Sequence, residues 1–165
     1  MAIETISFKW AWKLITWLPG FLQKWFFPKV WFEKQVKVDL RPRYEAVTLF
    51  AGDKKDIKIW LRVTNFTYFD IEVEKLIIKY MSAGHTVELT NFKKQVITSL
   101  SYWDFLLDNN LTSDHVAAIE RTYSKHQREN IFVYAEINSK VQNFKLDLSL
   151  DNVQSTLNNF NLVDI

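Results

Sequence analysis

The 165-residue chain contains no cysteine and only three glycines, three prolines and three histidines. The absence of cysteine excludes disulfides, thiolate catalysis and every cysteine-based zinc or iron–sulfur site. It is also compatible with a reducing compartment, and we therefore expect a cytoplasmic location. Because Gly20, Gly52 and Gly84 lie far apart, the sequence forms neither a glycine-rich phosphate-binding loop nor the G-x-S-x-G turn of a hydrolase.

Candidate catalytic and metal-binding groups are sparse. His115 and His126 are eleven residues apart, about 16 Å along a continuous helix, so they cannot share a metal ion there. His85 lies in an expected turn. Glu72 and Glu74 share one face of an expected strand and alternate with apolar residues, which is typical of a solvated strand face rather than of acid–base catalysis. We expect no enzyme activity, no metal site and no cofactor.

The net charge of +2 conceals an uneven distribution of charge along the chain. From Met1 to Lys34 there are five lysines and two glutamates, whereas the remaining residues include 16 basic and 17 acidic side chains. The sequence lacks the concentrated basic stripe that nucleic-acid binding needs, so we expect no nucleic-acid partner. The positive excess instead coincides with five of the seven tryptophans.

The first 34 residues are predicted to form an amphipathic helical segment. On a helix over residues 3–18, four polar side chains recur at spacings of four and three and form one narrow stripe: Thr5, Lys9, Lys13 and Thr16. The rest of that helix is apolar. Pro19-Gly20 ends it, and a second apolar piece over residues 21–27 ends before Pro28.

Neither a secretion signal nor a membrane span suits this segment. Glu4 precedes every lysine and no A-x-A cleavage pattern follows, which disfavours a signal peptide. The charge-free stretch from Leu14 to Leu22 is broken by Pro19-Gly20, whereas a span needs about 20 apolar residues. Tryptophan favours the membrane interface and lysine favours anionic headgroups, so we expect an interfacial helix or a shallow wedge in one leaflet. The alternative is packing on the chain's own body or on another protein.

The side chains expected to meet an anionic lipid surface or a protein partner lie within residues 1–32. They are Phe8, Lys9, Trp10, Trp12, Lys13, Leu14, Trp17, Leu18, Phe21, Lys24, Trp25, Phe26 and Trp31.

From Gln35 the apolar pattern changes to period two, which predicts strands. The expected strands cover residues 35–41, 44–50, 57–65, 70–82, 86–92, 95–101, 130–138 and 143–150. The alternation slips near Lys75, which predicts a bulge. Asp104 and Asp108 are expected in a loop or at a cap.

One helix over residues 112–127 interrupts the strands. Thr112 or Ser113 suits its N-cap, and Asp114 falls in its first turn, where the helix dipole favours a carboxylate. We therefore expect a mainly β protein, a fibronectin- or immunoglobulin-like antiparallel β-sandwich with one helix. Its expected parts are the helical segment 1–34, the sandwich 35–150 and a polar, loosely held tail 151–165.

A family resemblance begins where a hydrophobic alternating strand ends in the V-x-N step Val63–Asn65. An aromatic-rich loop follows, then a strand with the I-x-V motif Ile71–Val73, then a small-residue turn at Gly84. The stretch resembles the late-embryogenesis-abundant type 2 proteins and their water-stress (WHy) domain. The resemblance covers roughly residues 35–150, and Asn65-Phe66 replaces the Asn-Pro that is usual in the family.

This resemblance implies a seven-stranded, fibronectin-like sandwich with no catalytic residues. It also implies a role in stress protection or lipid contact, in some members with an N-terminal membrane segment. We expect a non-enzymatic, peripherally membrane-associated protein that acts as a lipid-contacting, protective or interaction module. The alternative is a soluble structural or adaptor subunit whose tryptophan-rich segment docks into a protein assembly or homo-oligomer.

Overall fold

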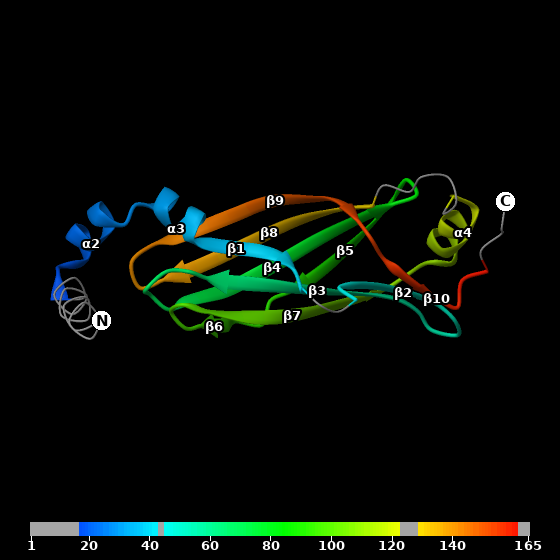
Figure 1. Ribbon diagram of the computed structural model, residues 1–165, viewed down its shortest axis with the longest axis horizontal. Coiled ribbons are helices and arrows are strands. Elements are labelled where there is room, and N and C mark those ends of the chain that lie inside the picture. Colours follow the sequence, from blue (N-terminus) through cyan, green and yellow to red (C-terminus); the bar gives the residue numbers. More distant parts are fainter. Residues whose placement is uncertain (1–16, 43–44, 123–128, 162–165) are drawn as a thin grey trace, which may run out of the picture.

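The computed structural model describes residues 17–42, 45–122 and 129–161 (Figure 1). Its helices are α2 (Gly20–Phe26), α3 (Lys29–Gln35) and α4 (Ser113–Thr122). Its strands are β1 (Val36–Leu40), β2 (Val47–Ala51), β3 (Lys55–Asn65), β4 (Ile71–Ser82), β5 (His85–Asn91), β6 (Gln95–Ile97), β7 (Ser101–Asn110), β8 (Glu129–Ser139), β9 (Asn143–Val153) and β10 (Thr156–Asn158).

These strands form two five-stranded sheets, and the fold is a β-sandwich as predicted. In the first sheet β7 pairs along β3, while β1 and β2 pair with successive halves of β3 and β10 extends the sheet beyond β2. In the second sheet β5 and β6 pair with successive parts of β4. Strand β8 pairs with the other edge of β4, and β9 pairs with β8. Every pairing is antiparallel except that of β10 with β2.

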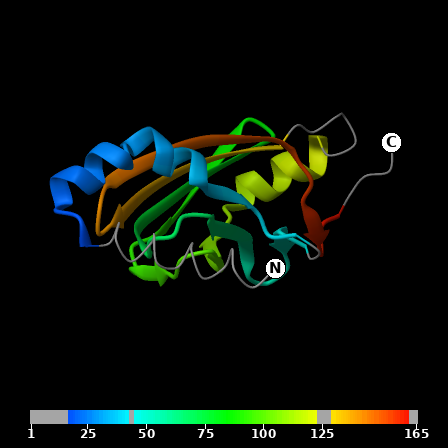
Figure 2. The ribbon, with the colours of Figure 1, turned by 60° about the vertical axis from the view of Figure 1, so that its left-hand side comes forward.

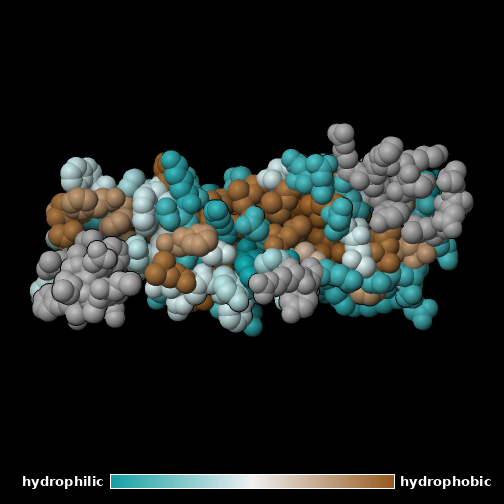
Figure 3. Space-filling model, viewed as in Figure 1, coloured by the Kyte–Doolittle hydropathy of each residue, from teal (hydrophilic) through white to brown (hydrophobic). Residues whose placement is uncertain are grey.

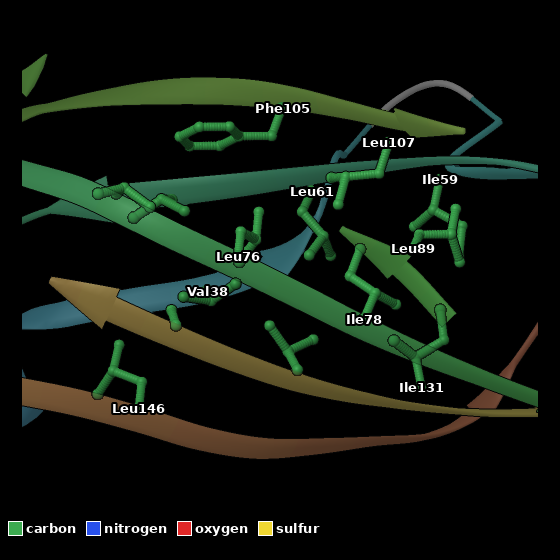
Figure 4. Packing of buried hydrophobic residues seen from close by; sticks show 14 of the residues in the cluster. Val38, Ile59, Leu61, Leu76, Ile78, Leu89, Phe105, Leu107, Ile131 and Leu146 are labelled. Atoms are coloured by element: carbon green, nitrogen blue, oxygen red, sulfur yellow. The ribbon is translucent and has the colours of Figure 1, made fainter. Parts of the chain in front are cut away.

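The core lies between the two sheets, because alternate residues of each strand point inward. Ile59 and Leu61 of β3 meet Leu76 and Ile78 of β4 in this layer, and Ile131 of β8 is equally buried (Figure 4). The long central strands β3 and β8 therefore show strict alternation in the sequence, and β4 alternates on either side of one slip. The predicted bulge is confirmed, since the register of β4 against β8 shifts between Val73 and Lys75.

The prediction of a loop around Asp104 and Asp108 was wrong, because both residues belong to the ten-residue strand β7. Asp104 lies opposite Arg62 and Asp108 opposite Lys58 on the outer face of the sheet. Leu106 lies on the same outer face and is exposed. This apolar residue at a polar position interrupts the alternation, and for that reason the sequence did not indicate a strand here.

Helix α4 begins as predicted. The backbone N–H of His115 donates to the hydroxyl of Thr112 at 3.2 Å, which is the N-cap hydrogen bond. Val116 and Ile119 are buried against the sandwich. Residues 123–127 of the expected helix lie outside the described residues.

Two short helices precede β1, and a proline stands immediately before each of them: Pro19 before α2 and Pro28 before α3. The sequence predicted the first as an apolar piece and included the second in the helical segment 1–34, but it did not predict that α3 anchors the segment to the body. Phe32 of α3 is fully buried, and its ring centroid lies 5.7 Å from that of Phe69 and 5.6 Å from that of Phe144.

The ends of the sandwich therefore extend beyond the predicted range 35–150. Phe32 brings part of the segment 1–34 into the core. In the predicted tail, residues 156–158 form β10, and Leu157 and Phe160 pack against the core.

Replacing Phe32 with alanine should lower the free energy of unfolding by about 3–5 kcal/mol, because it removes a fully buried aromatic ring from the core. The matched control is Val30→Ala on the same helix, where the side chain is exposed and the expected change is within about 0.5 kcal/mol. Urea denaturation of both variants measures the difference. Equal effects would show that α3 is not part of the folded body.

Candidate functional site

The most exposed large apolar side chains of the described chain lie in and beside α2. Trp17 is 89% exposed, Trp25 75% and Phe21 71%, and Phe26 and Val30 are also more than half exposed. Helix α2 extends away from one end of the sandwich, whereas α4 covers the other end (Figures 1 and 2). Hydrophobic side chains are accordingly visible over α2 at the left-hand end in Figure 3.

Aromatic stacking joins this segment to the sandwich. The ring of Phe27 lies 5.0 Å from that of Trp31 and 5.1 Å from that of Phe69, both edge to face. The side-chain amide of Gln142, in the β8–β9 turn, donates to the carbonyl oxygen of Phe27 at 3.3 Å. Residues 27–32 therefore form the attachment, and residues 17–26 form an exposed apolar segment, which we call the aromatic arm.

The structure divides the predicted contact residues into three groups. Trp17, Phe21, Lys24, Trp25 and Phe26 are exposed on the aromatic arm, whereas Leu18 is half-buried. Trp31 packs against the core. The remaining six, Phe8, Lys9, Trp10, Trp12, Lys13 and Leu14, lie outside the described residues. Among the described helices, none is both long and apolar enough for a membrane crossing.

The end of the sandwich next to the arm is held by Asn65, which is fully buried at the end of β3. Its Nδ2 donates to the carbonyl oxygens of Phe69 at 2.8 Å, Thr98 at 3.0 Å and Ile97 at 3.3 Å. Its Oδ1 accepts from the N–H and the hydroxyl of Thr67, at 3.0 and 2.7 Å. One side chain thus ties the β3–β4 loop (66–70) to the β6–β7 connection (98–100).

Asn65→Ala should lower the free energy of unfolding by about 3 kcal/mol, because it leaves several buried backbone carbonyls without a donor. Asn143→Ala is the control, since Asn143 is exposed on β9 and its loss should change stability by less than about 0.5 kcal/mol. Urea denaturation measures both. A loss for Asn65→Ala as small as the control's would contradict the role given to this amide.

The titratable groups whose pKa is shifted mainly by burial lie at the opposite end of the sandwich. The rings of His85 and His115 meet edge to face with centroids 4.7 Å apart, and burial together with the charge of His85 lowers the pKa of His115. Nearby, burial raises the pKa of Glu129, although its Oε1 accepts a 2.7 Å hydrogen bond from Ser155. Within the described part of the chain, no group of three or more His, Asp or Glu residues is arranged to hold a metal ion.

Glu129 predicts a specific pH dependence. Because its pKa in the folded protein is raised above the ordinary 4.5, the group contributes stability that is fully present below that value. This contribution is lost as pH rises through the raised pKa. Glu129→Gln should therefore be more stable relative to wild type at pH 7 than at pH 4, as urea denaturation across this range will show. The exposed Glu88→Gln serves as control, and a difference that does not change with pH would contradict the prediction.

Two shallow grooves on the sandwich are lined by charged, polar and apolar side chains. One of about 730 Å³ lies on the outer face of β4 and β8, where Lys79 pairs with Glu88 at 4.0 Å and Lys75 lies 5.8 Å from the ring of Tyr134. The other, of about 720 Å³, lies between the ends of β1 and β9, where half-buried apolar residues such as Leu40 and Leu150 line the edge. The three large apolar side chains with the highest exposed fractions among the described residues lie on the arm rather than in these grooves.

No protein-family model matches the sequence, and comparison with curated protein sequences finds no match either. Solved structures similar to the chain include a structural genomics target, 10% identical, with a TM-score of 0.49 over 72% of this chain and 85% of that one. A protein from Arabidopsis thaliana is 12% identical with a TM-score of 0.41, over 75% and 82% of the two chains.

A third similar structure is of a protein described as late embryogenesis abundant. It is 11% identical with a TM-score of 0.35, over 92% of this chain and 90% of that one. The chain is thus weakly similar to a late-embryogenesis-abundant protein. At this identity and TM-score the similarity assigns neither a specific family nor a function.

Proposed function

We propose that this protein is a non-enzymatic β-sandwich module that associates with anionic lipid membranes through its N-terminal segment. The observation that carries the proposal is the aromatic arm, whose rings Trp17, Phe21 and Trp25 are at least 71% exposed. Exposed aromatic side chains that are contiguous on the surface mark an interaction site. The arm leaves the sandwich at a fixed point, so its rings are held away from the body.

The composition of the arm favours a bilayer over a protein partner. Phe21 and Trp25 are four residues apart on α2 and so lie on one face, with the exposed Lys24 beside them. Aromatic rings partition to the interface between headgroups and acyl chains, where an indole N–H remains hydrated. Lysine near anionic headgroups adds about 1 kcal/mol. The tryptophans and lysines of residues 8–14 extend the same composition.

We also propose a specific family for the sandwich: a water-stress (WHy) type domain of the late-embryogenesis-abundant type 2 class. It is supported by the V-x-N step that ends β3, the aromatic loop after it, the I-x-V start of β4 and the turn at Gly84. The hydrogen bonds of Asn65 provide a structural reason for asparagine at the last position of that step.

Flotation of the full chain with phosphatidylserine–phosphatidylcholine vesicles tests the membrane proposal. The wild-type protein should float, and the variant Trp17→Ser, Phe21→Ser, Trp25→Ser should bind at least about tenfold more weakly, because three rings no longer enter the interface. The matched control is Met81→Ser, Leu106→Ser, Phe132→Ser, which removes three exposed apolar side chains from the strands. It should float like the wild type.

A wild-type protein that stays at the bottom of the gradient contradicts the membrane proposal. If the wild type instead forms a defined oligomer in solution that the three arm substitutions dissociate, the arm docks on protein. Sedimentation velocity without vesicles distinguishes these outcomes.

A further inference from the structure

We infer that the sandwich contributes a second lipid-contacting surface beside the arm, so that the domain meets the bilayer end-on. This inference rests on the proposed function. The surface consists of three exposed side chains from the β3–β4 loop and from residues 100–102, namely Phe66, Leu100 and Tyr102, and we call it the end surface.

Each side chain of the end surface is about half exposed or more, from 46% for Phe66 to 61% for Leu100. They come from two distant parts of the sequence that the fold holds together. The N–H of Leu100 donates to the carbonyl oxygen of Thr67 at 3.1 Å, and the N–H of Ser99 donates to Asp70 Oδ1 at 2.9 Å. Together with the buried Asn65 amide, these bonds make the end surface a fixed feature of the fold.

The backbone at Leu100 supports a functional reading of this turn. Leu100 has φ of 54°, in the left-handed region where glycine or asparagine is the easier residue. Here a large apolar side chain is placed at a costly backbone angle and is left exposed. Strain of this kind, once observed, points to a function of the side chain rather than to packing.

The end surface is continuous with the attachment of the arm. The N–H of Phe66 donates to the carbonyl oxygen of Gln35, the last residue of α3, at 2.9 Å. Phe69 of the same loop stacks on Phe27, where the arm begins. The arm and the end surface are therefore attached to the same end of the sandwich, opposite α4 (Figures 1 and 2).

The charges around this end fit an anionic surface. Lys34, Lys37 and Lys140 are exposed there, and Lys37 Nζ lies 5.9 Å from the ring centroid of Phe66. Of the carboxylates near this end, Glu33 pairs with Lys29, Asp104 pairs with Arg62, Glu72 and Glu74 share Lys94, and Asp70 accepts the N–H of Ser99. The three exposed lysines complement phosphatidylserine headgroups.

Because the chain has no cysteine, a single introduced cysteine carries an environment-sensitive fluorophore such as NBD at one chosen position. Three full-length variants are compared: Trp25→Cys on the arm, Leu100→Cys on the end surface, and Phe132→Cys on the outer face of β8. Each is titrated with phosphatidylserine–phosphatidylcholine vesicles. We expect blue-shifted, brighter emission at positions 25 and 100, and no change at position 132.

The outcomes separate the two proposals. A shift at position 25 without one at position 100 overturns the inference and leaves the proposed function intact. No shift at positions 25 or 100, together with failure of the wild type to float, overturns both. An equal shift at position 132 contradicts the end-on orientation. A shift at position 100 that grows with protein concentration in the absence of vesicles identifies a second copy of the chain as the occupant and overturns lipid contact.

Discussion

The buried carboxamide of Asn65 is the constraint on which the arm end of this sandwich depends. Where β3 ends, the chain has to turn into β4 while the β6–β7 connection passes beside it, and the backbone groups of both loops are shielded from water. Asn65 supplies the donors and the acceptor that those groups need. Unpaired buried backbone groups are costly, so this amide permits a tight, ordered end that holds exposed aromatic side chains in place.

The two ends of the sandwich differ in chemistry. The arm end presents aromatic rings and lysines. The opposite end buries Glu129 and brings His85 against His115 of α4. A membrane surface carries a negative potential that attracts cations and repels carboxylates, so the proposed contact through the arm end would keep the buried carboxylate away from the bilayer. The long strands β3, β4 and β8 separate these two environments.

The sequence predicted the fold where side-chain alternation was strict. Strands β3, β4 and β8 were found because one face of each is continuously apolar. The strand β7 was missed because Leu106 lies on its outer face and obscures the alternation. The burial of helix α3 was missed for a related reason: among many aromatic residues, periodicity cannot show that Phe32 is core while Trp25 is exposed. The end surface depends on contacts between residues 29 and 33 positions apart, which no local pattern contains.

The attachment of the arm determines how two weak surfaces act together. If residues 17–26 were joined to the sandwich by a flexible linker, membrane contact by the arm would leave the body free to rotate. Here Phe27, Trp31 and Phe32 pack on the body within a few residues of the exposed rings. In the proposed membrane contact, entry of the arm into the interface would hold the end surface beside the bilayer at high effective concentration, so that its own contribution would cost little further entropy. Under that proposal, the buried ring of Phe32 would link core stability to the orientation of the protein on the bilayer.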